Sequence, residues 1–216
     1  AVQANMILAN GCLAWMSPQE SPWFGYEPPQ GRDTDGARRW LSEATERTRQ
    51  EMALSNFYTA IHEFYLDRSA FGTSALYVEP GARRPLNVQC WPVGTFVIDE
   101  DAEGNVDTVI REFELTVRQA MQKFGARCSG RVQDMAGQGG AKLHEKVKFL
   151  HCIVPRTREE MAAGQDAPSQ MPVASIYLER ETKHVCRVSG YEEMPVMVSR
   201  YLEWGSGLGS LYGWSP

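Results

Sequence analysis

TFVIDEDAEGNVDTVIREFELTVRQAMQKFG, residues 95–125, contains the most regular structural pattern in the chain, because each local choice in it supports its neighbours. The β-branched and aromatic residues at 95–99 favour a half-buried strand, and the segment 106–115 is typical of a second strand. Between them, Gly104 can take the positive φ that closes a hairpin containing a bulge. The pattern therefore predicts antiparallel pairing of two adjacent strands.

A helix is predicted after the hairpin, and capping residues indicate where it begins and where it ends. Thr116 and Gln119 have the spacing of a capping box, and Gly125 is suited to the position after the last turn. The apolar positions recur at helical spacing: Val117, Ala120, Met121 and Phe124. No side chain in the hairpin or the helix indicates catalysis. We therefore expect scaffold here, with Glu112 and Glu114 available as surface contacts.

The composition is that of a globular protein of one or two domains. The chain has 216 residues, of which 43% are hydrophobic and 23% charged, enough for a sizeable core. No apolar run approaches the roughly 18 residues of a membrane span, and the apolar N-terminus lacks the basic leader and cleavage site of a signal peptide. The five cysteines are widely spaced and odd in number, which favours reduced thiols in a cytosolic setting.

The charge argues against tight binding of nucleic acid. The formal net charge is −5, and the basic pairs Arg38-Arg39 and Arg83-Arg84 are isolated, as solvated surface residues usually are. A protein that grips DNA usually presents a basic face. Loose passage of DNA past a mildly acidic surface stays compatible with this composition, because counterion release would add little affinity.

The N-terminal third is predicted to contain helices and an irregular arm. Residues 1–16 suit a short amphipathic helix that is interrupted near Gly11. The segment 17–32 is too rich in Pro and Gly for a regular element, and it is either a loose linker or an arm that packs on a neighbouring subunit. Helical periodicity then covers 35–71 in two helices. The first of these has its apolar positions at Trp40, Leu41, Ala44 and Thr48.

From residue 73 the hydrophobic period changes to two, as in strands. Strands are expected at 74–79, 86–91, 95–99, 106–115, 146–154, 173–180, 183–188 and 196–202. The glycine-rich segment 125–142 is predicted to be a mobile connection with a short helix near 132–135, and 155–171 to be a surface loop. Strands joined by hairpins, with helices segregated from them, indicate an α+β fold in which N-terminal helices pack on a largely antiparallel sheet.

Three regions are expected along the chain. Residues 1–32 form an N-terminal helix and an extended arm. Residues 33–204 form one α+β domain, in which helices at 35–71 precede a sheet with an inserted helix at 73–204. Residues 205–216 form a glycine-rich tail.

The residue types of a zinc site occur near two of the later strands. They are His144, His151, Cys152, His184 and Cys186. His184 and Cys186 share a strand face, but His151 and Cys152 are adjacent and face opposite ways, and no C-x-x-C or H-E-x-x-H spacing occurs. The pattern does not predict a metal site, although it leaves a small zinc- or thiol-dependent enzyme as the alternative function.

Other reactive residues also lack a supporting pattern. The cysteines do not lie at predicted helix N-termini, where a thiol would be activated. His62, Glu63 and Asp67 have no second carboxylate or nucleophile at helical spacing, so a solvated face is favoured. The glycines of the run that ends the chain depart from the G-x-G-x-x-G spacing: Gly205, Gly207, Gly209 and Gly213. The sequence thus predicts no catalytic, cofactor-binding or metal-ligating residue.

Six segments, in order along nearly the whole chain, carry a family resemblance. They are SPWFGYEP (21–28), NFYTAIHEFYLDRSAFGTSALYVEP (56–80), DAEGNVDTVIREFELTVRQAMQKFG (101–125), HCIVPR (151–156), SGYEEMPVMVSRYLEW (189–204) and YGWSP (212–216). Together they resemble the N-terminal, wing portion of the bacteriophage head-to-tail connecting (portal) proteins of short-tailed phages and prophages. Trp214 stands where that family more usually has Arg.

The resemblance implies a structural protein rather than an enzyme. Proteins of this family form a ring at one capsid vertex, through which a terminase motor drives double-stranded DNA and on which tail proteins dock. The implied partners are other copies of the chain, the terminase, capsid and tail proteins, and DNA that passes without sequence readout. No cofactor and no membrane are implied. The implied location is the virion, and the host cytoplasm during assembly.

Members of the family continue past the Tyr-Gly motif into channel-lining helices. The resemblance therefore implies that this chain is a fragment or a truncated copy, whose glycine-rich tail leads to a missing channel region. A free-standing adaptor that binds another phage protein is a third interpretation.

Overall fold

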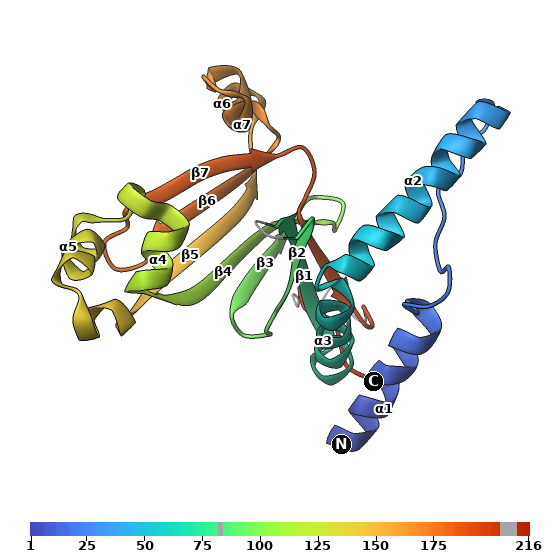
Figure 1. Cartoon of the computed structure of the whole chain (residues 1–216), viewed down its shortest axis with the longest axis horizontal. Helices are drawn as coiled ribbons and strands as arrows, with labels where there is room; N and C mark the ends of the chain where they lie inside the picture. Colours follow the sequence, from blue (N-terminus) through green and yellow to red (C-terminus); the bar gives the residue numbers. More distant parts are fainter. Residues whose placement is uncertain (82–83, 204–210) are drawn as a thin grey trace. The chain divides into compact units, whose positions relative to one another are not determined.

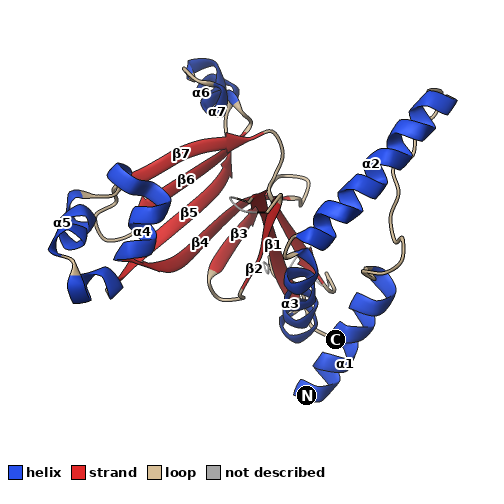
Figure 2. Ribbon diagram, viewed as in Figure 1, coloured by secondary structure: helices blue, strands red, loops and turns tan. Residues whose placement is uncertain are grey.

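The computed structural model describes residues 1–81, 84–203 and 211–216. These residues form seven α-helices and eight strands, and the strands make two antiparallel sheets. The predicted α+β class is confirmed, and Figure 2 shows how helices and strands are distributed.

The chain divides into two compact units. Unit 1 comprises Ala1–Val93 together with Val196–Pro216, and unit 2 comprises Gly94–Pro195. The boundaries of these units differ from those of the three regions expected from the sequence. The reason is that the last strand pairs within the unit that contains the N-terminus. Most of the glycine-rich tail, residues 205–210, lies outside the described residues, as does Arg83.

Unit 2 is built on a five-stranded meander in which each strand pairs with the next. Its strands are β3 (Phe96–Glu100), β4 (Val106–Thr116), β5 (Lys146–Pro155), β6 (Val173–Glu179) and β7 (Val185–Tyr191), as Figure 1 shows. The hairpin predicted at its start is confirmed. Gly104 has a φ of +85°, the Asp101 amide donates to the Asn105 carbonyl at 2.9 Å, and the register shifts at Asp99/Glu100.

Two helices cover part of one face of this sheet. Helix α4 (Val117–Phe124) begins with the predicted Thr116/Gln119 capping box, and α5 (Gly130–Gln138) follows it. Phe124 of α4 packs on Phe149 of β5 with 5.4 Å between ring centroids. The cluster includes these fully or almost fully buried residues: Val117, Ala120, Val132, Val147, Phe149 and Tyr177.

Two segments of unit 2 are more regular than the sequence analysis expects. The predicted connection at 125–142 contains η1 (Gly125–Arg127), α5 and η2 (Gly140–His144). Helix α5 confirms the short helix expected near 132–135 and is longer than expected, because Ser129 caps it and Val132 is fully buried. The predicted loop at 155–171 contains α6 (Arg158–Ala163) and α7 (Ala167–Gln170). Each of these short helices starts with a capping box, at Thr157/Glu160 and at Asp166/Ser169, which satisfies its first amides locally.

Unit 1 combines both ends of the chain in one sheet. Its strand order is β2 (Leu86–Trp91), β1 (Thr73–Pro80), β8 (Val196–Arg200). Helix α3 (Phe57–Phe71) packs on β1 and β2 through its aromatic side. The core of this unit contains Ala9, Phe57, Ala60, Ile61, Phe64, Tyr65, Leu76 and Val88.

The first two helices of unit 1 bury little of their surface. Helix α1 (Val2–Met16) runs without a break through Gly11, so the predicted interruption is wrong: one glycine weakens a helix by about 1 kcal/mol but does not end it. Helix α2 (Asp35–Leu54) has no buried residue. Trp40, predicted on its apolar side, is 67% exposed, because the half-buried side runs through Leu41 and Ala44 instead.

The final residues close unit 1 by a backbone contact that requires glycine. Gly72 ends α3 with a φ of +77°, and a Cβ placed there would collide with the carbonyl oxygen of Gly213. The Gly213 amide donates to Thr73 Oγ1 at 2.7 Å, and the Trp214 amide donates to the Leu202 carbonyl at 2.9 Å. The YGWSP segment is therefore fastened to the start of β1.

Candidate assembly surface

The His and Cys residues that suggested a zinc site are not brought together. His144 is exposed in η2, and His184 Nε2 lies 3.0 Å from the Arg127 carbonyl oxygen. His151 is buried on one face of β5, whereas Cys152 lies on the opposite face. Within the described ranges, no three His, Cys, Asp or Glu side chains are placed to hold a metal ion.

His151 is instead part of the packed interior of unit 2. Its ring stacks on Tyr177 with 3.8 Å between centroids, and its Nε2 lies 2.9 Å from Ser175 Oγ. Burial lowers the pKa of His151 to about 3, and the cations Lys123, Arg111 and Arg187 contribute to the shift. The imidazole is therefore neutral at physiological pH. The sequence analysis did not identify this His151–Ser175 pair, because 24 residues separate its members.

Four of the five thiols are made poor nucleophiles by burial. Burial raises the pKa of Cys90 to about 12 and that of Cys186 to about 11, and it also raises the pKa of Cys128 and of Cys152. Cys128 lies just before the N-cap of α5, which corrects the expectation that no cysteine stands at a helix N-terminus. Desolvation, with the charge of Glu179, outweighs any activation there.

The acidic and histidine residues of α3 have structural contacts. His62 Nε2 lies 2.8 Å from Asn10 Oδ1 of α1, so it joins the two helices. Burial raises the pKa of Asp67, which accepts a hydrogen bond from Cys90 Sγ at 3.8 Å. These contacts give no arrangement in which a carboxylate and a base face a common open pocket.

Helix α1 presents an unusual exposed surface. Its sequence, VQANMILANGCLAWM, contains no charged residue, yet only its Ala9 side is buried against unit 1. The exposed side chains form what we call the α1 apolar surface: Val2, Met6, Ile7, Leu8, Trp15 and Met16, between 38% and 89% exposed. A helix that is apolar on all sides is normally buried on all sides. This surface is therefore suited to contact another protein surface.

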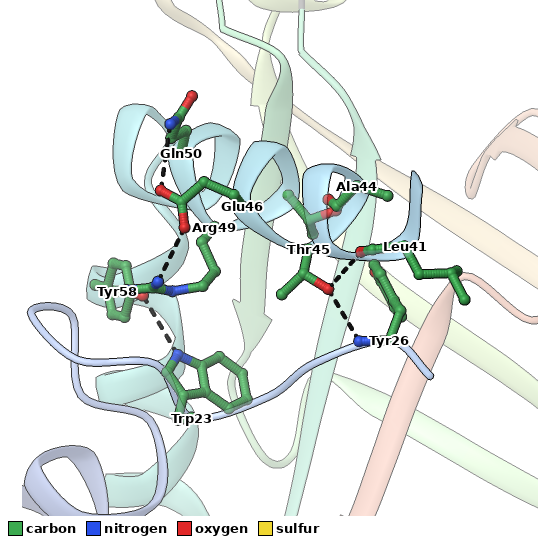
Figure 3. Close-up of polar contacts among 10 residues, drawn as sticks. Trp23, Tyr26, Leu41, Ala44, Thr45, Glu46, Arg49, Gln50 and Tyr58 are labelled. Atoms are coloured by element: carbon green, nitrogen blue, oxygen red, sulfur yellow. Dashed lines mark hydrogen bonds and ion pairs between the residues drawn. The ribbon is translucent and has the colours of Figure 1, made fainter. Parts of the chain in front are cut away.

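The arm at 17–32 is fastened to its own chain by aromatic residues (Figure 3). Trp23 stacks on Phe57 with 6.2 Å between ring centroids. Its Nε1 donates to Tyr58 Oη at 3.5 Å, as Figure 3 shows. The Tyr26 amide donates to Thr45 Oγ1 of α2 at 2.9 Å. The segment is irregular, as predicted, and these contacts position α2 relative to α3.

A pocket of about 680 Å³ lies between the arm and α2. Both of its arginines are paired within the chain, because Arg38 pairs with Asp33, and Arg49 Nη1 lies 3.1 Å from Glu46 Oε2. The pocket is open and mixed in sign.

The five-stranded sheet has a second exposed surface. Registered pairing aligns one apolar residue from each strand, and we call this set the sheet apolar row: Val97, Ile110, Cys152, Ile176 and Val188. Val97 and Val188 at its two ends are 57% and 55% exposed. The row crosses the whole width of the sheet, so it is a second candidate contact surface.

Glu112 and Glu114, expected as surface contacts, stand beside this row in ion pairs of the sheet itself. Glu112 lies 2.6 Å from Arg180 Nη1 and 3.4 Å from Lys148 Nζ. Glu114 lies 3.0 Å from Lys146 Nζ, and this hydrogen bond lowers its pKa. Both carboxylates are accessible but not without partners.

Among the helices of the described residues, none has both the length and the apolar character that crossing a membrane requires.

Comparison with known proteins identifies a family and two similar phage proteins. The family model described as bacteriophage head to tail connecting protein matches residues 1–216. The chain is 31% identical over 219 residues to a probable portal protein of Bordetella phage BPP-1, covering 99% of this chain and 38% of the relative. It is 28% identical over 203 residues to the portal protein of Salmonella phage epsilon15, covering 92% of this chain and 36% of the relative. The chain thus spans a little over a third of the length of these curated relatives.

Proposed function

The chain belongs to the bacteriophage head to tail connecting protein family, and on this premise we propose that it acts as a portal protein of a phage or prophage. In this role it is a subunit of a ring at one capsid vertex, through which double-stranded DNA is packaged and ejected. The observation that carries the proposal is the match over residues 1–216, together with two portal relatives that align with 92% and 99% of this chain. The matching region is thus almost the complete chain.

The proposed partners follow from this role. They are other copies of the chain, the terminase, capsid proteins and tail proteins. Double-stranded DNA passes through the ring without sequence readout, which suits a chain of net charge −5. The location is the virion, with the host cytoplasm as the place of assembly.

We propose a structural and not a catalytic contribution for these residues. Raised thiol pKa values argue against the alternative of a thiol enzyme, because the thiolate is the nucleophilic form. The buried, neutral and stacked state of His151 argues against its use as a general base or a zinc ligand.

The ring contact is proposed to use the α1 apolar surface. A closed head-to-tail ring needs two different faces on each subunit, one for each neighbour. The uncharged α1 apolar surface supports one such face, and the sheet apolar row supports the other. Burial of either removes apolar area from water, at about 25 cal/mol for each Å².

Native mass spectrometry of the protein, produced with and without its terminase and capsid partners, tests this proposal. We expect closed oligomers from a full-length protein that contains this chain, and a double substitution Met6→Glu/Trp15→Glu should abolish them while leaving the fold intact, since both side chains are more than half exposed. The 216 residues alone should be monomeric or weakly associated if one of the two ring contacts lies outside them. Gln19→Glu, an added charge in the arm outside the surface, is the matched control. Oligomers that persist in the double variant would exclude α1 as the contact, and a monomer under all conditions would count against the ring itself.

A further inference from the structure

Three cationic side chains of unit 2 line one small pocket. Lys123 at the end of α4, Arg127 of η1 and Arg187 of β7 surround a space of about 230 Å³, together with the ring of Phe124. We call this the basic pocket. All three cations are exposed to solvent, so a ligand can reach them.

The two arginines of the basic pocket differ in their surroundings from most basic residues of the described chain. Elsewhere arginines and lysines stand beside carboxylates, as in the pairs Arg38–Asp33, Arg49–Glu46, Arg131–Glu181, Lys142–Glu145, Lys146–Glu114, Arg180–Glu112 and Arg200–Glu203. In the described part of the chain, neither Arg127 nor Arg187 has a carboxylate within ion-pair distance. Like charges that converge repel one another, so an anion between them would be stabilised.

The fold holds these groups in place before any ligand arrives. The Lys123 ammonium lies over the Tyr177 ring, 4.7 Å from its centroid. Behind it, Arg111 of β4 lies over the Phe113 ring at 5.4 Å and adds a further positive charge to this side of the sheet. The Arg127 backbone is held by His184 Nε2 at 3.0 Å. A cation fixed by an aromatic ring loses less freedom when it binds an anion.

The surroundings of the basic pocket indicate what size of anion it accepts. A second, shallower hollow of about 470 Å³ shares Arg127 and Arg187 with it and adds the polar side chains of Gln133 and His184. Two guanidinium groups can each form two parallel hydrogen bonds to one tetrahedral oxyanion, while the ammonium contributes a point charge. This geometry suits phosphate better than a single carboxylate, and the shared hollow leaves room for what is attached to the phosphate.

We propose that the basic pocket binds a phosphate group. The phosphate comes either from the backbone of duplex DNA or from free inorganic phosphate, and both sources present the same oxygens. The DNA source rests on the proposed function, in which DNA passes through the ring of which this chain forms a part. Contacts to phosphate alone carry no sequence information, so such a site would steady any duplex regardless of its sequence.

The test uses the full 216-residue chain. Inorganic phosphate is titrated at low ionic strength, with chloride at matched ionic strength as reference, and the imidazole and aromatic resonances of His151 and Tyr177 are followed by NMR. Saturable shifts are expected with phosphate only. Arg127→Gln and Arg187→Gln should each weaken binding about tenfold, the loss expected for one charge-assisted contact. Arg118→Gln removes an exposed arginine from the same helix as Lys123 but outside the pocket, and it should leave the affinity unchanged.

A second arm replaces phosphate by a short mixed-sequence duplex. Duplex binding that competes with phosphate and is lost in Arg127→Gln supports DNA as the source. Binding of phosphate without binding of duplex supports the free anion as the source. Shifts that are equal with chloride, or an affinity that is the same in both arginine variants as in the wild type, overturn the proposal. These outcomes are measured on the unassembled chain, so they test the phosphate site independently of ring formation.

Discussion

The sheets of units 1 and 2 differ in how far apart in the sequence their paired strands lie. In unit 2 every strand of the sheet pairs with its neighbour in sequence, and its helices are inserted between consecutive strands. In unit 1 the central strand β1 pairs on one side with β2 and on the other with β8, from the far end of the chain. Pairing of consecutive strands costs little loop-closure entropy. In unit 1, by contrast, β8 can pair with β1 only when a loop of more than a hundred residues is closed.

The two units also differ in how much of their helix surface is buried within the unit. Unit 2 has an aromatic core in which Phe113, Phe124, Phe149 and Tyr177 contact one another. Unit 1 contains a 15-residue uncharged helix that is mostly exposed and a 20-residue helix without a buried residue. This difference indicates that unit 2 is stabilised mainly by its own packing, while unit 1 keeps surfaces that assembly can bury.

The largest effect is expected from Phe149→Ala. Phe149 is fully buried at the centre of unit 2, and truncation of such a ring costs about 4 kcal/mol of folding free energy. Chemical denaturation followed by segment-resolved hydrogen exchange should show the loss in residues 94–195 first. Phe71→Ala, at a phenylalanine of unit 1 that is 58% exposed, should cost less than about 0.5 kcal/mol. Equal losses at both positions would contradict the difference between the units.

Gly72→Ala should destabilise unit 1 by roughly 3 kcal/mol, because a positive φ and a collision with the Gly213 carbonyl act together. The matched control is Gly104→Ala in unit 2, where φ is +85° but nothing lies within 4 Å of the added methyl group. That change should cost only about 1–2 kcal/mol. Thermal unfolding measures both. An equal loss of folding free energy in the two variants would show that the backbone contact between Gly72 and the C-terminal segment adds nothing to stability.

The stability of unit 2 should fall as the pH is lowered below about 6.5. The folded-state pKa of His151 is lowered from 6.5 to about 3, so the unfolded chain binds a proton in this range and the folded chain does not. The contribution is complete above pH 6.5 and decreases towards pH 3, with a loss of about 2 kcal/mol by pH 5. Denaturant titrations at several pH values measure the slope.

His151→Gln should flatten this slope, since glutamine does not titrate. A wild-type slope that survives in His151→Gln would assign the pH dependence to other groups.

The smallest effect on stability is expected from the double charge reversal Glu112→Lys/Glu114→Lys. Exposed ion pairs contribute about 0–1 kcal/mol each, so the isolated chain should remain folded. Assembly of the ring should weaken if these carboxylates meet a neighbouring subunit beside the sheet apolar row. Native mass spectrometry of the assembled protein measures this, with Glu103→Lys in the β3–β4 turn as control. An unchanged ring would remove both glutamates from the contact.

Much of the secondary structure can be predicted from the sequence because it depends on interactions between neighbouring residues. The 95–125 stretch has the expected hairpin, bulge and capping box, since each depends on residues within a few positions of one another. The errors have local causes too. Gly11 does not end α1, because one glycine only weakens a helix, and the capped helices α6 and α7 lie in a polar stretch that also contains proline and glycine.

The candidate surfaces were less accessible to sequence reasoning. The apolar residues of α1 are visible in the sequence, but their exposure depends on which side α3 covers. The sheet apolar row needs five strand registers at once, and the basic pocket needs Lys123 and Arg187 to meet across 64 residues of chain.

The α+β class, the first hairpin with its capped helix and the family resemblance follow from contiguous residues, because periodicity, turn chemistry and motifs are local properties. The division into two units, the backbone contact of Gly72 with Gly213, the neutral state of His151 and the convergence of three cations depend on tertiary packing. Burial and charge proximity arise from residues that are distant in the chain, and no local pattern specifies them.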